Sequence, residues 1–229
     1  MAGTMVEFAS NGGTAQGYLA TPASGNGPGV VVIQEWWGLV PHIKSVCDRF
    51  AAEGFVALAP DLYHGETTTE PDEAGKRLMA LNIAQAGTDM HGAATYLAHL
   101  PQVTSQSVAA IGFCMGGALA LYAAGASPEI GPVVDFYGAH PNVHPDLDHV
   151  RGPVMGNFAA RDGSFAPGQI DALERDLNAR GVPTDFKTYP DCDHAFFNDD
   201  RPPPNGPYNA AAAADAWGRT LTFLRAHLR

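Results

Sequence analysis

Six short runs of mostly apolar, β-prone residues recur along the chain and constrain its fold more than any other feature. Most of them lack the alternation of polar and apolar residues that marks a strand with one solvent-exposed face. Such runs are typical of strands that are buried on both faces of a parallel sheet. They span residues 29–33, 55–59, 107–112, 132–138, 152–159 and 184–189.

Helical periodicity fills the intervals between these runs. In the clearest case Ile43, Val46, Cys47 and Phe50 fall on one face of a helix, and Gly54 follows as a stop signal. The stripe also indicates that Cys47 is a core residue. Strands that alternate with helices predict right-handed crossovers and an open, doubly wound α/β sheet. Further helices are expected over about 72–99, as one helix or as two with Gly87 between them, and over about 115–125, 167–180 and 209–228.

The N-terminal segment follows a different pattern. Residues 5–8 and 16–20 alternate in polarity around a Ser-Asn-Gly-Gly turn, which predicts a β-hairpin. A chain of 229 residues with 45% apolar content can bury one sizeable core, so we expect a single domain over residues 1–229. The proline-rich stretch 201–207 is expected to be a rigid connection, because only one helix follows it.

The charge balance restricts the class of partner. The formal net charge is -11, and the 13 Lys and Arg residues are scattered, which argues against a nucleic-acid or membrane-surface partner. The opening residues lack the pattern of a signal peptide, and no run approaches the roughly 18 apolar residues of a membrane helix. We therefore expect a cytoplasmic protein that acts on a small molecule, with no oligomeric state specified.

The stretch Gly112-Phe113-Cys114-Met115-Gly116 joins one apolar run to a predicted helix. It reproduces the nucleophile-elbow pattern G-x-S-x-G with sulfur in place of oxygen. Ligands of open α/β sheets bind at the carboxyl ends of the strands, and a helix N-terminus favours a thiolate. The alternative is that Cys114 is a small buried hydrophobic residue in a common glycine-rich turn.

Two later residues favour the catalytic interpretation. Asp162 follows the run 152–159 in the turn-forming segment ARDGS, and His194 follows the run 184–189. Taken singly, Asp162 is typical of a turn and His194 of a solvated loop. However, nucleophile, acid and base follow in this order in α/β-hydrolases, each in a loop after a strand. The sequence therefore predicts a triad of Cys114, Asp162 and His194.

Five motifs carry a resemblance that covers nearly the whole chain: GFCMGG (112–117), QEWWGL (34–39), PDLYHG (60–65), DFYG (135–138) and HAFFN (194–198). With them the chain resembles the dienelactone hydrolases, also called carboxymethylenebutenolidases, of the α/β-hydrolase superfamily. The resemblance implies an α/β-hydrolase fold, no cofactor, and an ester or lactone as substrate. It matches Cys114 to the nucleophile, Asp162 to the acid, His194 to the base, and Glu35 to a glutamate beside the cysteine.

Acyl transfer also needs donors for the oxyanion. The expected donors are the backbone N–H of Met115 and, by resemblance, that of Trp36.

Because a thiolate departs more readily than an alkoxide, enol lactones and activated esters are the expected substrates. Glu35 would keep the resting thiol protonated by charge repulsion and hydrogen bonding, and would release it when substrate binds.

The substrate-binding residues depart from the family pattern. Family members bind a substrate carboxylate with arginines, one of them shortly after the catalytic histidine, where this chain has Phe197 and Asn198. Trp37, Arg77, Phe197 and Arg201 are the candidates for substrate contact. Alternatively, Trp36 and Trp37 only pack their own loop.

Two other functions remain open at this point. Asp191, Cys192, Asp193 and His194 could form part of a metal site, as could the run His140, His144 and His149, which would indicate a metal-dependent hydrolase. We expect no metal, because the first group lacks an obvious partner pair and the second is typical of a solvated loop. The last alternative is a non-catalytic binding protein with this fold.

Overall fold

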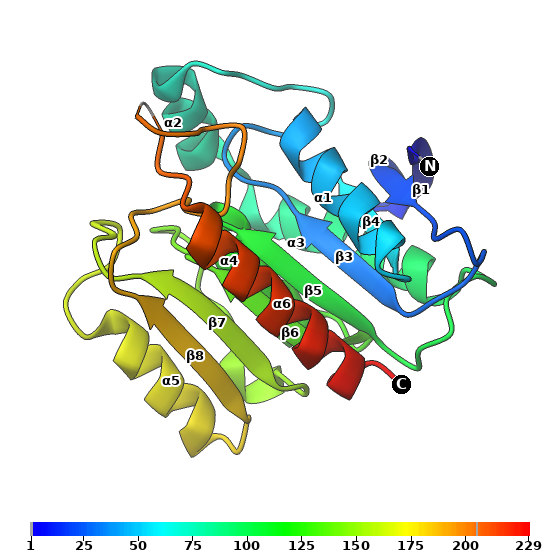
Figure 1. Ribbon diagram of the computed structural model, residues 1–229. Helices are drawn as coiled ribbons and strands as arrows, with labels where there is room; N and C mark the ends of the chain where they lie inside the picture. Colours follow the sequence, from blue (N-terminus) through cyan, green and yellow to red (C-terminus); the bar gives the residue numbers. More distant parts are fainter. Residues whose placement is uncertain (1, 205) are drawn as a thin grey trace.

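The computed structural model describes residues 2–204 and 206–229, and its centre is an eight-stranded sheet with helices on both faces (Figure 1). The strand order is β1-β2-β4-β3-β5-β6-β7-β8. Strand β2 pairs antiparallel with β1 and β4, and all other pairs are parallel. The predicted N-terminal hairpin and mostly parallel sheet are thus confirmed. The strands are β1 (Thr4–Ser10), β2 (Gly13–Ala20), β3 (Gly29–Ile33), β4 (Val56–Pro60), β5 (Val108–Phe113), β6 (Ile130–Phe136), β7 (Val154–Ala159) and β8 (Thr184–Tyr189).

The helices form the two outer layers. Side chains of α1 and α6 belong to one apolar cluster, and those of α3, α4 and α5 to a second cluster on the other face of the sheet. Among the described helices, none combines the length and the apolar character needed to cross a bilayer. They are α1 (Pro41–Ala52), α2 (Pro71–Ala80), α3 (Ile83–Ala98), α4 (Met115–Ala126), α5 (Gln169–Ala179) and α6 (Ala210–His227), with a short 3₁₀ helix at Leu147–His149.

The double-sided burial of the central strands explains why their sequences lack polar alternation. All residues of β3 are buried, and its side chains alternate between the two clusters. Val30 and Val32 point into the layer of α1 and α6, whereas Val31 and Ile33 point into the layer of α3 and α4. Each position therefore needs an apolar side chain.

The structure corrects the expected division of residues 72–99. The two helices are separated at Leu81 and Asn82, and the Asn82 side chain accepts a hydrogen bond from the Gln85 N–H at 3.1 Å, which caps α3. Gly87 lies inside α3 instead of breaking it. A Cβ at this position would lie 2.7 Å from the ring of Tyr122 in α4, so the glycine permits close contact between two helices.

The parallel strands bring distant loops to one edge. Because β3, β5, β7 and β8 run in the same direction, the loops after their carboxyl ends all open at this edge of the sheet. Glu35, Cys114, Asp162 and His194 lie in these four loops.

Candidate active site

Cys114 occupies a strained turn between β5 and α4. Its backbone has φ 56° and ψ -125°, a conformation that non-glycine residues rarely adopt. The flanking glycines make this turn possible. A Cβ at Gly112 would lie 1.8 Å from the Gly116 carbonyl oxygen, and one at Gly116 would lie 2.5 Å from the Ile33 carbonyl oxygen. The five residues therefore form the predicted elbow, with the thiol held at the N-terminus of α4.

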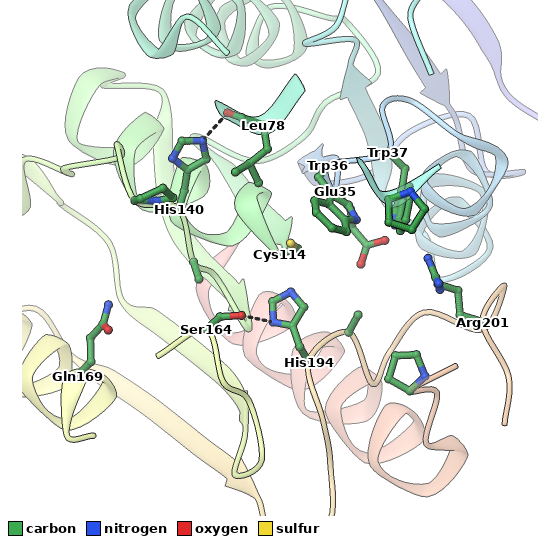
Figure 2. Close-up of a pocket in the computed structure, with 15 residues that line it drawn as sticks. Glu35, Trp36, Trp37, Leu78, Cys114, His140, Ser164, Gln169, His194 and Arg201 are labelled. Atoms are coloured by element: carbon green, nitrogen blue, oxygen red, sulfur yellow. Dashed lines mark hydrogen bonds between the residues drawn. The ribbon is translucent and has the colours of Figure 1, made fainter. Parts of the chain in front are cut away.

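His194 and Asp162 form a close pair beside this thiol. His194 Nδ1 lies 2.6 Å from Asp162 Oδ2, and the second carboxylate oxygen accepts a hydrogen bond from the Ser164 N–H at 2.8 Å. The Ser164 hydroxyl lies 3.5 Å from the same imidazole nitrogen. Since an ionised carboxylate only accepts, Nδ1 carries the proton, and the other ring nitrogen points toward Cys114 (Figure 2).

The electrostatics of this group favour a charged imidazole. Burial lowers the pKa of His194, but its hydrogen bonds and charge interactions with Asp162 and with the Cys114 sulfur outweigh burial and raise the pKa to about 10. Burial raises the pKa of Asp162, but the hydrogen bonds with His194 and with the Ser164 N–H lower it by a larger amount, so the net shift of this pKa is downward. The carboxylate is thus ionised at neutral pH and stabilises an imidazolium.

Glu35 lies at the same cleft with very little exposure to solvent. Only 1% of the residue is exposed, and its Oε2 accepts a hydrogen bond from Asn198 Nδ2 at 2.6 Å. Burial raises the pKa of the Glu35 carboxyl, whereas His42, Asn198, His194 and Arg201 act in the opposite direction without reversing the shift. Glu35 therefore takes up a proton at a higher pH than an exposed glutamate does.

The Glu35, Cys114 and His194 side chains line a cleft of about 690 Å³ at the carboxyl edge of the sheet. Figure 2 shows Cys114 near its centre, with Arg201 on one side and His140 on the other. The Arg201 guanidinium lies 4.8 Å from the ring centre of Trp37. The remaining lining residues are Glu35, Trp36, Pro71, Leu78, Ala139, Pro141, Ser164, Gln169, His194, Ala195 and Pro207.

Two of the four candidates for substrate contact do not line the cleft. Phe197 is 1% exposed and stacks on Phe113 with ring centres 5.3 Å apart, so it is a core residue. Arg77 forms an ion pair with Glu66 and faces a separate surface depression. The sequence could not show that these two residues lie outside the cleft. Arg77 is next to the lining residue Leu78, and Phe197 follows the lining residue His194 by three positions.

The two expected oxyanion donors lie close to Cys114, one next to it in the chain and one in the lining of the cleft. Met115 is the first residue of α4, where an N–H group has no partner within the helix. Trp36 follows β3 and lines the cleft beside Cys114. Within residues 2–204 and 206–229, neither N–H group donates a hydrogen bond to protein.

Several of the potential metal ligands named from the sequence have other interactions. His140 bonds to the Leu78 carbonyl oxygen, His149 pairs with Asp146, and Arg161 pairs with Asp193. Among the described residues, one different group brings its donor atoms within 4.8 Å of one another: His42, Asp199 and Asp200.

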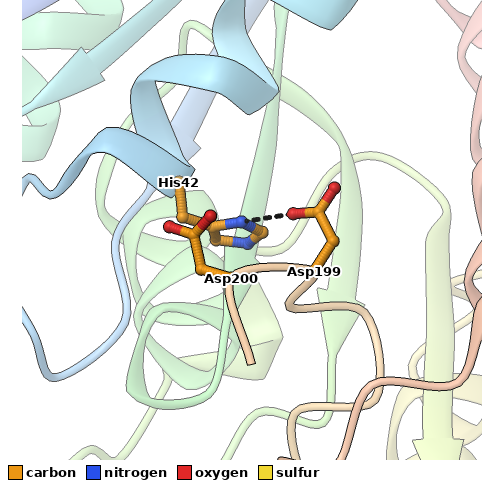
Figure 3. A group of neighbouring side chains, drawn as sticks. All are labelled: His42, Asp199 and Asp200. Carbon is orange, nitrogen blue, oxygen red and sulfur yellow. Dashed lines mark hydrogen bonds and ion pairs between the residues drawn. The ribbon is translucent and has the colours of Figure 1, made fainter. Parts of the chain in front are cut away.

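Figure 3 shows this group at the start of α1. His42 is buried and its Nδ1 lies 3.0 Å from Asp199 Oδ1, while both aspartates are exposed. The hydrogen bond gives the buried imidazole a partner, which is sufficient reason for an aspartate at this position.

Three residues of the site were not singled out by sequence reasoning. Ser164 supports Asp162, and the turn segment ARDGS contained that signal because an aspartate often accepts from the N–H two residues later. Asn198 holds Glu35. Tyr137, with φ 43°, is fully buried and packs its ring edge-to-face on His194 at 5.1 Å, a contact for which the motif DFYG gave no indication.

Comparisons with known proteins agree with this fold. A sequence profile described as the dienelactone hydrolase family matches residues 15–228. The protein usf of Aquifex pyrophilus is 36% identical, with 99% of each chain covered. A candidate carboxymethylenebutenolidase of Aquifex aeolicus is 31% identical over 99% of this chain and 100% of the relative. The crystal structure of a candidate dienelactone hydrolase from Klebsiella pneumoniae superposes with a TM-score of 0.84 at 27% identity, covering 98% and 99% of the two chains.

Proposed function

The chain belongs to the dienelactone hydrolase family and has the α/β-hydrolase fold, and on this premise we propose that it hydrolyses enol lactones or activated carboxylic esters through a thioester on Cys114. The family provides the class of enzyme, a hydrolase. The nucleophile, the triad and the bond that is cleaved are our proposal.

One arrangement carries the proposal. The Cys114 thiol lies in a strained strand-to-helix turn beside the His194 imidazole. Nδ1 of this imidazole, the nitrogen that points away from the thiol, is 2.6 Å from the buried Asp162 carboxylate. Cys114 is the nucleophile, His194 is the general acid and base, and Asp162 fixes the tautomer of the imidazole. A buried structural cysteine would need neither the strained backbone nor this pair.

The first half-reaction acylates the enzyme. The Cys114 thiolate attacks the acyl carbon, and the carbonyl electron pair moves onto oxygen, which accepts hydrogen bonds from the N–H groups of Met115 and Trp36. When the adduct collapses, the C–O bond breaks and the leaving oxygen takes the proton from the His194 imidazolium. A thioester and a neutral imidazole result.

The second half-reaction regenerates the thiolate. Water attacks the thioester carbon while His194 removes its proton, and the C–S bond then breaks to release the acid and the Cys114 thiolate. Glu35 acts before this cycle: in the empty enzyme its carboxylate disfavours the thiolate, and when substrate displaces it the Cys114 thiol gives its proton to His194, which becomes the imidazolium of the first half-reaction. Its place at the cleft and its single hydrogen-bonded oxygen support that role.

The sulfur nucleophile limits the substrate. An adduct with an alkyl ester expels the thiolate in preference to the alkoxide, so it returns to substrate. An enol or aryl leaving group is a much weaker base and competes with the thiolate. We assign to Arg201 the binding of a carboxylate of such a substrate, and the position of its guanidinium over Trp37 in the cleft supports this role.

The test compares three esters that share one acyl group: vinyl, 4-nitrophenyl and ethyl butyrate. We expect acylation of the wild type by the first two and little by the third, with the mass of one butyryl group added to the intact protein. Digestion should locate that group on Cys114. Replacement of Cys114 by Ala should abolish both turnover and the added mass.

The other two cysteines are the matched controls. Cys47 is a fully buried residue of α1, and Cys192 is 2% exposed. Cys47→Ala and Cys192→Ala should retain acylation. Activity that persists in Cys114→Ala, or ethyl and vinyl butyrate acylating at equal rates, would contradict the proposal.

A further inference from the structure

Helix α2 is a wall of the cleft with few attachments to the sheet. Of its ten residues only Ala74 is buried, while Pro71 and Leu78 face the cleft. The ion pair between Arg77 and Glu66 joins α2 to the segment that leads into it, so it does not tie the helix to the sheet. The position of this wall therefore depends on a small number of other contacts.

One of these contacts is made by His140, in the loop after β6. Its Nε2 lies 3.1 Å from the Leu78 carbonyl oxygen. Leu78 belongs to the last four residues of α2, whose carbonyl groups have no partner within the helix. The imidazole thus satisfies a carbonyl at the helix end that borders the cleft.

The second ring nitrogen fixes the protonation state. His140 Nδ1 accepts a hydrogen bond from the Asn142 N–H at 3.0 Å, so the proton must be on Nε2, which donates to Leu78. Only the neutral imidazole can make both bonds. Burial favours this form by lowering the pKa of His140, although the bond to the Leu78 carbonyl acts in the opposite direction.

The same loop is attached to the nucleophile. The N–H of Ala139 donates to the Cys114 carbonyl oxygen at 3.3 Å, and the N–H of Gly138 donates to Asp135 Oδ1 at 2.7 Å. The residue next to His140 therefore contacts the elbow, while His140 itself reaches α2. Figure 2 shows His140 and Leu78 on the side of Cys114 that lies away from Arg201.

We propose that His140 is a positioning residue whose hydrogen bond to the Leu78 carbonyl oxygen, called the latch below, holds α2 against the loop that contacts the nucleophile. The latch thereby limits the length of the substrate group on this side of the cleft. Leu78, Ala139 and Pro141 line the cleft beside His140, so the substrate group that they would contact is apolar. The size limit rests on the proposed function, whereas the latch itself does not.

Two variants separate the two bonds of the imidazole. In His140→Asn the side-chain oxygen lies near the place of the histidine Nδ1 and still accepts from the Asn142 N–H, but the side chain is too short to reach Leu78. Gln has an amide N–H near the position of Nε2 and reaches Leu78. His140→Asn should therefore open the latch, and His140→Gln should preserve it.

The first measurement is hydrogen exchange of the empty protein, followed by mass spectrometry of peptides from α2. Loss of one net hydrogen bond should raise exchange in residues 71–80 about fivefold in His140→Asn. His140→Gln should exchange at the wild-type rate, and peptides from β5 should not change in either variant. Equal α2 exchange in His140→Asn and wild type, or equally fast exchange in both variants, would overturn the latch.

The second measurement is kcat/KM for 4-nitrophenyl esters from acetyl to decanoyl. Esters too long for the closed cleft react through the open form, so the ratio of their kcat/KM to that of the acetyl ester should rise about fivefold in His140→Asn. His140→Gln should retain the wild-type ratio. Faster exchange without a changed ratio would overturn the size limit, and a protein that hydrolyses none of these esters would contradict the proposed function while leaving the exchange result valid.

Discussion

At the scale of single residues, the site depends on an imidazole that is surrounded by groups that favour its charge. The pKa of His194 is raised to about 10, in part by the Cys114 sulfur. Cys114→Ala should therefore lower this pKa, because the hydrogen bond and the charge interaction with the sulfur are lost while those with Asp162 remain. Nitrogen-15 NMR titration of the imidazole from pH 5 to 11 measures the change, and Cys192→Ala, two positions from the histidine, is the control that should not shift it.

The direction of this shift also gives the effect on stability. The pKa of His194 is higher in the folded protein than in the unfolded chain, so protonation of the imidazole stabilises the fold. This contribution to the free energy of unfolding is complete below about pH 6.5 and is lost as the pH rises through about 10. A pKa that is unchanged in Cys114→Ala would mean that the sulfur does not act on the imidazole.

Glu35 allows a second prediction about charge. In our proposal its carboxylate disfavours the Cys114 thiolate, so Glu35→Gln should speed alkylation of this thiol by iodoacetamide. Since burial raises the pKa of Glu35, the two proteins should differ least in acid, where the carboxyl is protonated, and increasingly as the pH rises. Alkylation rates against pH provide the measurement.

The matched control for Glu35→Gln is Glu53→Gln. Glu53 is at the end of α1 and pairs with Arg225, so it has the same charge but does not line the cleft. Alkylation in Glu53→Gln should follow the wild type. An equal acceleration in both variants would assign the effect to net charge, and a slower reaction of Glu35→Gln would remove the gating role.

Arg201 is the cleft residue to which we assign the binding of a substrate carboxylate. A hydrogen bond to a charged partner is worth more than a neutral one, so Arg201→Gln should lower kcat/KM for a carboxylate-bearing ester roughly 10- to 100-fold. An uncharged ester with the same leaving group should be nearly unaffected. Arg77→Gln is the control, because Arg77 pairs with Glu66 outside the cleft. Equal losses for both esters would contradict carboxylate binding.

At the scale of secondary-structure elements, the elbow requires glycine for steric reasons. A Cβ at Gly116 would lie 2.5 Å from the Ile33 and Gln34 carbonyl oxygens, so α4 could not pack against the end of β3. Gly116→Ala should destabilise the fold by roughly 3 kcal/mol, measured by urea unfolding. Gly163→Ala is the control, since its Cβ would meet nothing within 4 Å. Similar unfolding midpoints for the two variants would contradict the steric account.

Sequence patterns predicted the type of each strand and helix well, because β3, β5 and α1 carry strong periodic signals. They failed at Gly87, where the glycine serves contact with Tyr122 of another helix and not a local break. The same limit applies to the site. The order of Cys114, Asp162 and His194 along the chain pointed to one cleft, whereas the contacts of His140 with α2 depend on how distant loops meet.

At the scale of the whole molecule, stability and the site are largely separated in space. The loop after β3 borders the cleft, and α1 starts there and runs back along the sheet, so its last turn lies near the opposite edge. Phe50, in that turn, is fully buried and packs on Trp217 of α6 at 4.5 Å and on Phe55 at 5.9 Å. This contact joins the C-terminal helix to the N-terminal half of the chain.

Phe50→Ala should therefore weaken the fold without changing the chemistry. Removal of a fully buried phenylalanine costs about 3–5 kcal/mol, which at roughly 2–4 °C per kcal/mol lowers Tm by about 6–20 °C. At 25 °C the folded variant should retain the wild-type kcat/KM, because the residue lies away from the cleft. Phe186→Ala, at a half-buried position of the outer strand β8, should lower Tm less. If Phe50→Ala reduced kcat/KM in proportion to its loss of stability, the site would depend on the packing of α1 against α6, and the separation would be wrong.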